Sequence, residues 1–119
     1  MRFRYQGLDV TNDILALIRD VYQLTASFPS DERFGLASQL RRATNSILLN
    51  LAEGSARKSK KDFQRFITMS LGSVAEVHAA CSIAESMSFT TSASVYGIGK
   101  TLEKIWFRLC ALRESQNND

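Results

Sequence analysis

Apolar residues recur at alternating steps of three and four along most of this 119-residue chain. Such spacing gives a helix one apolar face, whereas a half-buried strand alternates in steps of two. The most regular stripe contains Phe63, Ile67, Ser70, Val74, Val77, Cys81 and Ala84. The chain has a single proline, Pro29, and no stretch of alternating β-branched residues. The sequence therefore predicts an all-α protein.

Four stripes of this kind predict four helices, over residues 9–27, 31–55, 60–87 and 93–114. The second stripe contains Leu36, Leu40, Ala43, Ile47 and Leu51, and the fourth contains Val95, Ile98, Leu102, Ile105, Leu109 and Leu112. Long helices with short connections are typical of an up-down-up-down antiparallel bundle. One domain is expected to cover residues 1–119, since a chain of this length can bury its own core.

Several residues near the expected helix ends suggest where each helix begins or stops. Ser30 is a good N-cap for the second helix, and Ser59, with Asp62 three residues later, resembles a capping box for the third. Gly54 is expected to leave the helical conformation at the end of the second helix. Gly72 lies in the middle of the third helix, where it is expected to let a neighbouring helix approach closely.

Positive charge is concentrated around the turn between the second and third helices, although the formal net charge is only +3. Lysines and arginines gathered on a turn attract polyanions without reading a base sequence. The predicted nucleic-acid contacts, for RNA or DNA, are Arg57, Lys58, Lys60, Lys61 and Arg65, with Arg41 as a further candidate. The alternative interpretation is a solvated turn that only keeps the protein in solution.

Polar residues descend the second helix at steps of three and four, and one large apolar residue, Leu49, lies among them. One interpretation is a contact between subunits of a homo-oligomer, made by Arg42, Ser46, Leu49 and Glu53. A single exposed leucine is also normal on a monomer. A second interpretation is a structural polar network of Asn50, Glu53 and Arg57, in which the last two are spaced i, i+4 as an ion pair requires.

Catalytic chemistry has little support in the residues. The only histidine, His78, lies two residues from Glu76, so the two point away from each other on a helix. The sequence contains no Gly-rich phosphate loop and no CxxC motif, and neither a cofactor nor a metal is predicted. Cys81 and Cys110 are expected to be reduced and buried. With no signal-like N-terminus or apolar run of membrane-spanning length, we expect a cytoplasmic protein that is not an enzyme and does not bind membranes.

The motifs resemble those of a known family. They are Phe28-Pro29, Arg41-Arg42-Ala43, Asn50-Leu51-Ala52-Glu53-Gly54, Arg57, Phe63, Arg65-Phe66 and Gly72-Ser73-x-x-Glu76. Together they are similar to the four-helix-bundle proteins encoded in intervening sequences of bacterial large-subunit ribosomal RNA genes, over about residues 8–115. The chain departs from the family at Leu48, where proline is common, and at Leu71, where an arginine often precedes Gly-Ser.

The resemblance implies an antiparallel bundle assembled as a ring-like homo-oligomer, with a pentamer favoured. It also implies kinship with accessory proteins of diversity-generating retroelements, which bind a reverse transcriptase and nucleic acid through basic surfaces. Two functional hypotheses follow. One is a non-catalytic protein that binds nucleic acid, RNA above all, through the basic turn, and the other is a protein-interaction scaffold with no nucleic-acid role.

Overall fold

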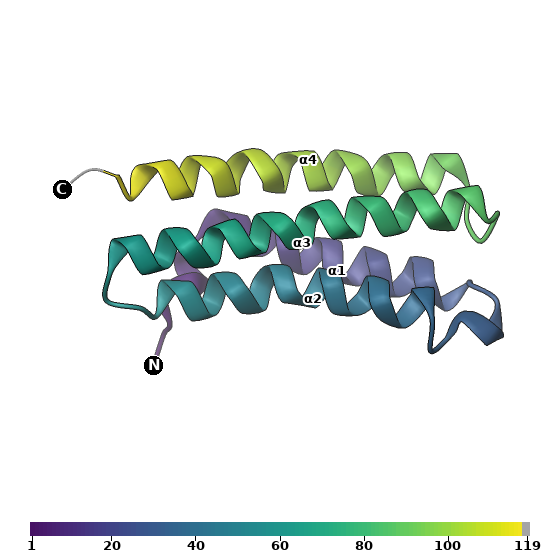
Figure 1. The fold of residues 1–119 in the computed structure, drawn as a ribbon, viewed down its shortest axis with the longest axis horizontal. Coiled ribbons are helices and arrows are strands. Elements are labelled where there is room, and N and C mark those ends of the chain that lie inside the picture. The colour runs from purple at the N-terminus through teal and green to yellow at the C-terminus, as the bar shows by residue number, and fades with distance from the viewer. Residues whose placement is uncertain (118–119) are drawn as a thin grey trace.

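The computed structural model describes residues 1–117 and, within them, four α-helices and no strand. The helices are α1 (Asp9–Ala26), α2 (Leu36–Ser55), α3 (Lys60–Ser86) and α4 (Ser92–Ser115). A short 3₁₀ turn, η1 (Arg4–Gly7), precedes α1, and a second, η2 (Ser30–Glu32), lies between α1 and α2. The helices run up and down along a rod of 49 × 25 × 20 Å (Figure 1). The predicted all-α four-helix bundle is confirmed.

Each helix packs against the helices before and after it, and α4 closes the bundle by packing against α1. The connection between α2 and α3 and the N-terminal arm therefore lie at the same end of the rod, where α4 also ends (Figure 1). The α1–α2 and α3–α4 connections lie at the other end. The up-down topology thus gathers three separate parts of the chain at one end.

The apolar stripes form a single core. All seven residues of the predicted α3 stripe and all five of the α2 stripe are buried. In α4 the four central stripe residues are buried, whereas Val95 and Leu112 pack against the core from its margins. The helix α3 is long and apolar enough to pass a composition test for a membrane span, but its apolar stripe lies inside this core.

The second helix begins later than predicted, at Leu36 instead of residue 31. Ser30 does not cap it, because Ser30–Glu32 forms a separate 3₁₀ turn. The carboxylate of Glu32 takes the capping role instead and accepts a hydrogen bond from the Leu36 N–H at 3.2 Å. The apolar stripe starts only at Leu36, so an extra helical turn before it would bury nothing. Phe34 accordingly lies in solvent, with its side chain 89% exposed.

Neither of the two glycines singled out in the sequence has its predicted role. Gly54 remains inside α2 and does not adopt a positive φ. It is buried against α3, where an added Cβ would lie 2.4 Å from the Cβ of Phe66. Gly72 is exposed, and an added Cβ there would meet nothing within 4 Å. Close approach of two helices therefore depends on Gly54, while Gly72 allows no close packing within the described chain.

The connection between α3 and α4 is a Schellman motif, in which the residue after the helix adopts a left-handed conformation. Ser88 has φ 61° and donates its N–H to the Glu85 carbonyl. The Phe89 N–H reaches back to the Ala84 carbonyl at 2.9 Å. The Phe89 ring then packs 5.8 Å from the ring of Phe28, which ties this turn to the end of α1.

Both cysteines are free, as expected. Cys81 is buried in the core, and burial raises the pKa of its thiol to about 11. It therefore behaves as a small apolar side chain. Cys110 is only partly buried at the margin of the core.

Candidate nucleic-acid interface

Close packing between α2 and α3 fixes the turn that carries the predicted basic cluster. The absence of a side chain at Gly54 lets Phe66 of α3 lie directly against α2, and Phe66 is buried. Two guanidinium groups stack on the Phe66 ring, that of Arg57 at 4.9 Å and that of Arg65 at 4.6 Å from its centroid. The two arginines are thus held in place by a buried aromatic ring.

Acidic residues compensate part of the arginine charge. Glu53, in the last turn of α2, pairs with Arg57, just beyond the helix, at 3.1 Å, as the i, i+4 spacing predicted. Asp62 pairs with Arg65 at 3.3 Å and lies 4.0 Å from Arg57. Asp62 also donates its backbone N–H to the Ser59 hydroxyl, so Ser59 caps α3 as predicted. The arginines therefore hold the turn together, and less of their charge is available to a ligand.

The lysines of the turn face solvent. Lys58, Lys60 and Lys61 are all exposed. Within residues 1–117, Lys58 and Lys61 have no carboxylate within 4.0 Å. Beside Lys61 is a shallow hollow of about 370 Å³ lined by Ser59, Asp62, Gln64, Arg65 and Thr68. Exposed ammonium groups beside hydroxyl and amide groups suit a phosphodiester backbone.

The N-terminal arm adds basic residues that the sequence did not place at this site. The guanidinium of Arg4 lies 4.7 Å from the ring centroid of Phe63, in the first turn of α3. The buried Thr11 hydroxyl donates to the Tyr5 carbonyl at 2.6 Å and anchors the arm to α1. Arg2 is exposed and donates to the Gln6 carbonyl. The basic and aromatic composition of residues 1–8 could have marked the arm as a candidate binding segment. Its place next to α3, however, follows from the topology of the bundle.

We call residues 2–7 and 53–65 together the basic end of the bundle. They contain seven basic and two acidic residues: Arg2, Arg4, Arg57, Lys58, Lys60, Lys61 and Arg65, against Glu53 and Asp62.

Arg41, predicted as a further nucleic-acid contact, lies away from the basic end. Arg57 lies sixteen positions after Arg41 and beyond the end of α2, which corresponds to about 24 Å at the rise of a helix. The Arg41 Nε donates to the Thr25 hydroxyl at 2.7 Å, and its guanidinium lies 4.5 Å from the ring centroid of Tyr22. Arg41 thus faces α1 and ties α2 to it. The structure therefore separates Arg41 from the basic cluster.

The predicted polar row of α2 is split between inward and outward positions. The Ser46 hydroxyl bonds the Ser73 hydroxyl of α3 at 2.6 Å, and Asn50 donates to the Ser46 carbonyl at 2.9 Å. Arg42 and Glu53 are exposed, and Leu49 is 66% exposed. Asn50 thus bonds within α2 and does not join the Glu53–Arg57 pair.

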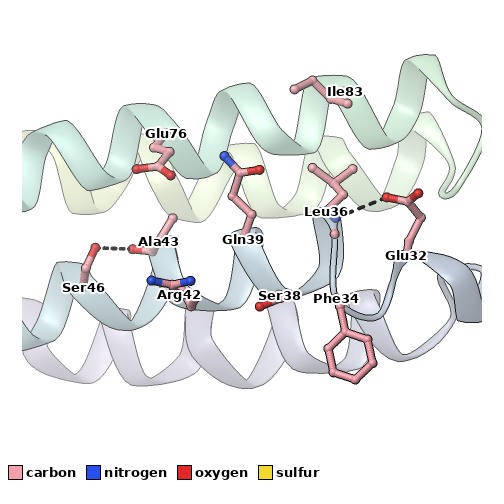
Figure 2. A pocket seen from close by; sticks show the side chains of 11 residues that line it. Glu32, Phe34, Leu36, Ser38, Gln39, Arg42, Ala43, Ser46, Glu76 and Ile83 are labelled. Carbon is pink, nitrogen blue, oxygen red and sulfur yellow. Dashed lines mark hydrogen bonds between the residues drawn. The ribbon is translucent and has the colours of Figure 1, made fainter.

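A groove runs along α2 and α3 next to this row (Figure 2). Gln39 and Ser46 of α2 and Glu76 of α3 line it, and its open volume is about 940 Å³. The Phe34 ring at its rim points away from α3 (Figure 2). The groove is wide open and its lining is mixed polar and apolar, whereas pockets that hold small ligands are enclosed and mostly apolar.

His78 is exposed on α3. Across residues 1–117, no group of three histidine, cysteine, aspartate or glutamate side chains is placed to hold a metal ion.

The chain was compared with protein-family models and with curated proteins. Residues 6–110 match the model of the family described as 23S rRNA-intervening sequence protein. The chain belongs to this family. None of the curated proteins matches it.

The motif that carried the resemblance lies at the junction of α2 with the basic turn. In Asn50-Leu51-Ala52-Glu53-Gly54, Leu51 is fully buried, Glu53 pairs with Arg57 and Gly54 admits Phe66. In this chain, the motif therefore builds the support for the basic end.

Proposed function

We propose that this protein is a non-catalytic, oligomeric four-helix-bundle protein that binds nucleic acid through the basic end. The observation that carries the proposal is the gathering of seven basic residues from two separate segments at one end of the rod. Neither the family description nor the all-helical fold suggests a catalytic role.

The arginines and lysines of the basic end differ in their surroundings, and this difference supports contact with the phosphate backbone of a nucleic acid. Arg57 and Arg65 are stacked on Phe66 and paired with acids, whereas Lys58 and Lys61 extend into solvent. Exposed lysines bind phosphates as mobile point charges, so they confer affinity without base specificity. The expected binding is accordingly strong at low salt and tolerant of sequence.

RNA is the nucleic acid that we favour. The family is described by the 23S rRNA intervening sequences that encode its members, and the basic end offers charges that would meet any phosphodiester backbone. An oligomer would place several basic ends on one particle and raise the overall avidity. We place this activity in the cytoplasm, where such RNA is present.

The test is fluorescence anisotropy with a labelled RNA of about 20 nucleotides, titrated at 50 and 200 mM salt. The proposal predicts binding at 50 mM salt that weakens at 200 mM, because counterions compete for the same phosphates. Lys61→Glu is expected to weaken the affinity. Lys100→Glu is its matched control, since it makes the same change in net charge on the α4 surface nearer the other end. Equal effects of the two variants would argue against a site at the basic end.

A second candidate function is a scaffold that docks another protein and has no nucleic-acid role. The Ser46–Ser73 bond sets the antiparallel register, which places exposed Leu49 level with exposed Met69 on α3. Large exposed apolar residues on neighbouring helices are a feature of protein contacts. The same face serves the predicted homo-oligomer, for which a ring of five subunits is favoured, and Arg42 and Glu53 flank Leu49 there.

Light scattering on Leu49→Glu tests the subunit contact. The mutant is expected to have a smaller solution mass than the parent, because a carboxylate would be buried in the interface. An unchanged mass would place the contact elsewhere.

A further inference from the structure

The N-terminal arm contributes an exposed aromatic ring to the basic end. Phe3, which lies between Arg2 and Arg4 in the sequence, is 55% exposed. Its ring lies 6.4 Å from the ring of Tyr5, with only 27° between the two planes. The two rings therefore form a short stack whose outer member, Phe3, contacts solvent.

Contacts that do not involve the Phe3 side chain hold this stack in place. The Phe3 N–H donates to the Gln6 side-chain oxygen at 2.7 Å, which closes the η1 turn. Arg4 stacks on Phe63 of α3, and Tyr5 is bonded through its carbonyl to Thr11 of α1. The arm that carries the Phe3 ring is thus anchored to α3 and α1. The ring is exposed although the backbone beneath it is held in place.

An exposed ring between two arginines of the sequence is suited to unpaired bases. A base in a duplex has its faces covered by its neighbours, so an aromatic side chain can stack only on a base that is unpaired or at an end. Proteins that bind single strands combine such rings with a positive surface that follows the backbone. Here the arm that carries the ring contacts the first turn of α3 through Arg4 and Phe63, at the same end of the rod as the α2–α3 turn.

We propose that the basic end is selective for single-stranded nucleic acid, with the Phe3 ring stacking on an unpaired base while Lys58 and Lys61 contact its phosphates. This inference rests on the proposed nucleic-acid function and adds the class of strand that the site takes. Arg2 and Arg4, the neighbours of Phe3 in the sequence, add positive charge to the arm.

The experiment compares a single-stranded 20-nucleotide RNA with the same strand annealed to its complement, by anisotropy at 50 mM salt. The parent is expected to bind the single strand at least five-fold more tightly than the duplex. Phe3→Ala is expected to weaken single-strand binding at least five-fold and to leave duplex binding within two-fold. Phe3→Trp is expected to restore single-strand affinity, because an indole ring also stacks on bases.

Phe34→Ala is the matched control. Phe34 is also an exposed phenylalanine beside an arginine, with the Arg33 guanidinium 5.4 Å from its ring, but it lies at the opposite end. It is expected to change neither affinity. A loss with Phe34→Ala as large as that with Phe3→Ala would overturn the role of Phe3.

The outcomes separate the two proposals. Equal affinity for single strand and duplex, with no effect of Phe3→Ala, would overturn the selectivity and leave the basic end as a binding surface. No binding of either RNA at 50 mM salt would overturn the proposed function and this inference with it. Selective loss that Phe3→Trp reverses supports both.

Discussion

The two ends of the bundle close their chain connections by different means. At the basic end, Gly54 and Phe66 pack closely, and two arginines stack on that phenylalanine. At the opposite end, the connections at residues 27–35 and 85–92 combine two backbone motifs, a 3₁₀ turn and a Schellman turn, with the Glu32 carboxylate cap and the Phe28–Phe89 ring contact. These opposite connections contain one basic and three acidic residues: Arg33, Asp31, Glu32 and Glu85.

The difference indicates what each end is built for. The opposite end satisfies its backbone groups locally and carries little positive charge. At the basic end, side-chain packing holds a dense group of like charges, which repel one another and would otherwise favour an open turn. A bound polyanion would offset this repulsion, so the packing at this end is consistent with a surface that binds one.

The largest expected effect is on nucleic-acid binding. Reversing two charges, in Lys58→Glu with Lys61→Glu, should weaken the affinity for single-stranded RNA about 100-fold, or ~2.7 kcal/mol, at 50 mM salt. The two ammonium groups are exposed and unpaired with any carboxylate in residues 1–117, so stability should change little. Anisotropy measures the affinity and circular dichroism the folding. An affinity within three-fold of the parent would contradict the claim that the basic end, and not the opposite end, binds nucleic acid.

A stability effect of about 2 kcal/mol is expected at Gly54. In Gly54→Ala the new methyl group would overlap Phe66, so α2 and α3 must move apart. Urea unfolding should show this loss as a lower midpoint. Gly72→Ala is the control, since a methyl group there meets nothing within 4 Å and should stabilise α3 by about 0.5–1 kcal/mol. Effects of the same sign would contradict the packing account.

A smaller loss is expected for Arg41→Ala, about 1 kcal/mol, because the hydrogen bond to Thr25 and the stack on Tyr22 disappear. The Thr25 hydroxyl still donates to the Val21 carbonyl at 2.8 Å, which limits the cost. RNA affinity should stay within about two-fold, since Arg41 lies outside the basic end. A ten-fold loss of affinity with normal stability would return Arg41 to the binding surface.

The smallest effect is expected in the turn at the opposite end. Ser88 holds φ 61°, a conformation that glycine adopts without a steric penalty. Ser88→Gly should therefore stabilise the protein by about 0.5–1 kcal/mol, seen as a higher midpoint in urea. A destabilised variant would mean that the serine side chain contributes more than its backbone strain costs.

The fold was largely predictable from the sequence, and the arrangement of the candidate site was not. The apolar stripes alone identify most of the core residues of α2 and α3, although Ala37, Leu71 and Ala80 lie outside them, because helix period and burial are directly linked. The start of α2 was misplaced, since Ser30, Asp31 and Glu32 satisfy capping rules without any apolar residue to bury. Gly54 is predicted to end α2, whereas it actually makes room for Phe66, because a sequence does not reveal which side chain approaches a glycine.

Within the site, the basic turn was found from charge density alone. The arm was not assigned to it, because the contact of Arg4 with Phe63 joins residues 59 positions apart. Arg41 was grouped with the turn because it is near in sequence, although its position on α2 faces α1. The predicted subunit contact around Leu49 and the predicted kinship with retroelement accessory proteins stay predictions.

The most direct test of the account is the salt dependence of RNA binding by the unmodified protein. If lysines of the basic end displace counterions from at least three phosphates, a plot of log K against log salt concentration should fall with a slope of about −2 or steeper for a single strand. A flat plot, or no binding at 50 mM salt, would contradict the claim that the basic end is a nucleic-acid surface.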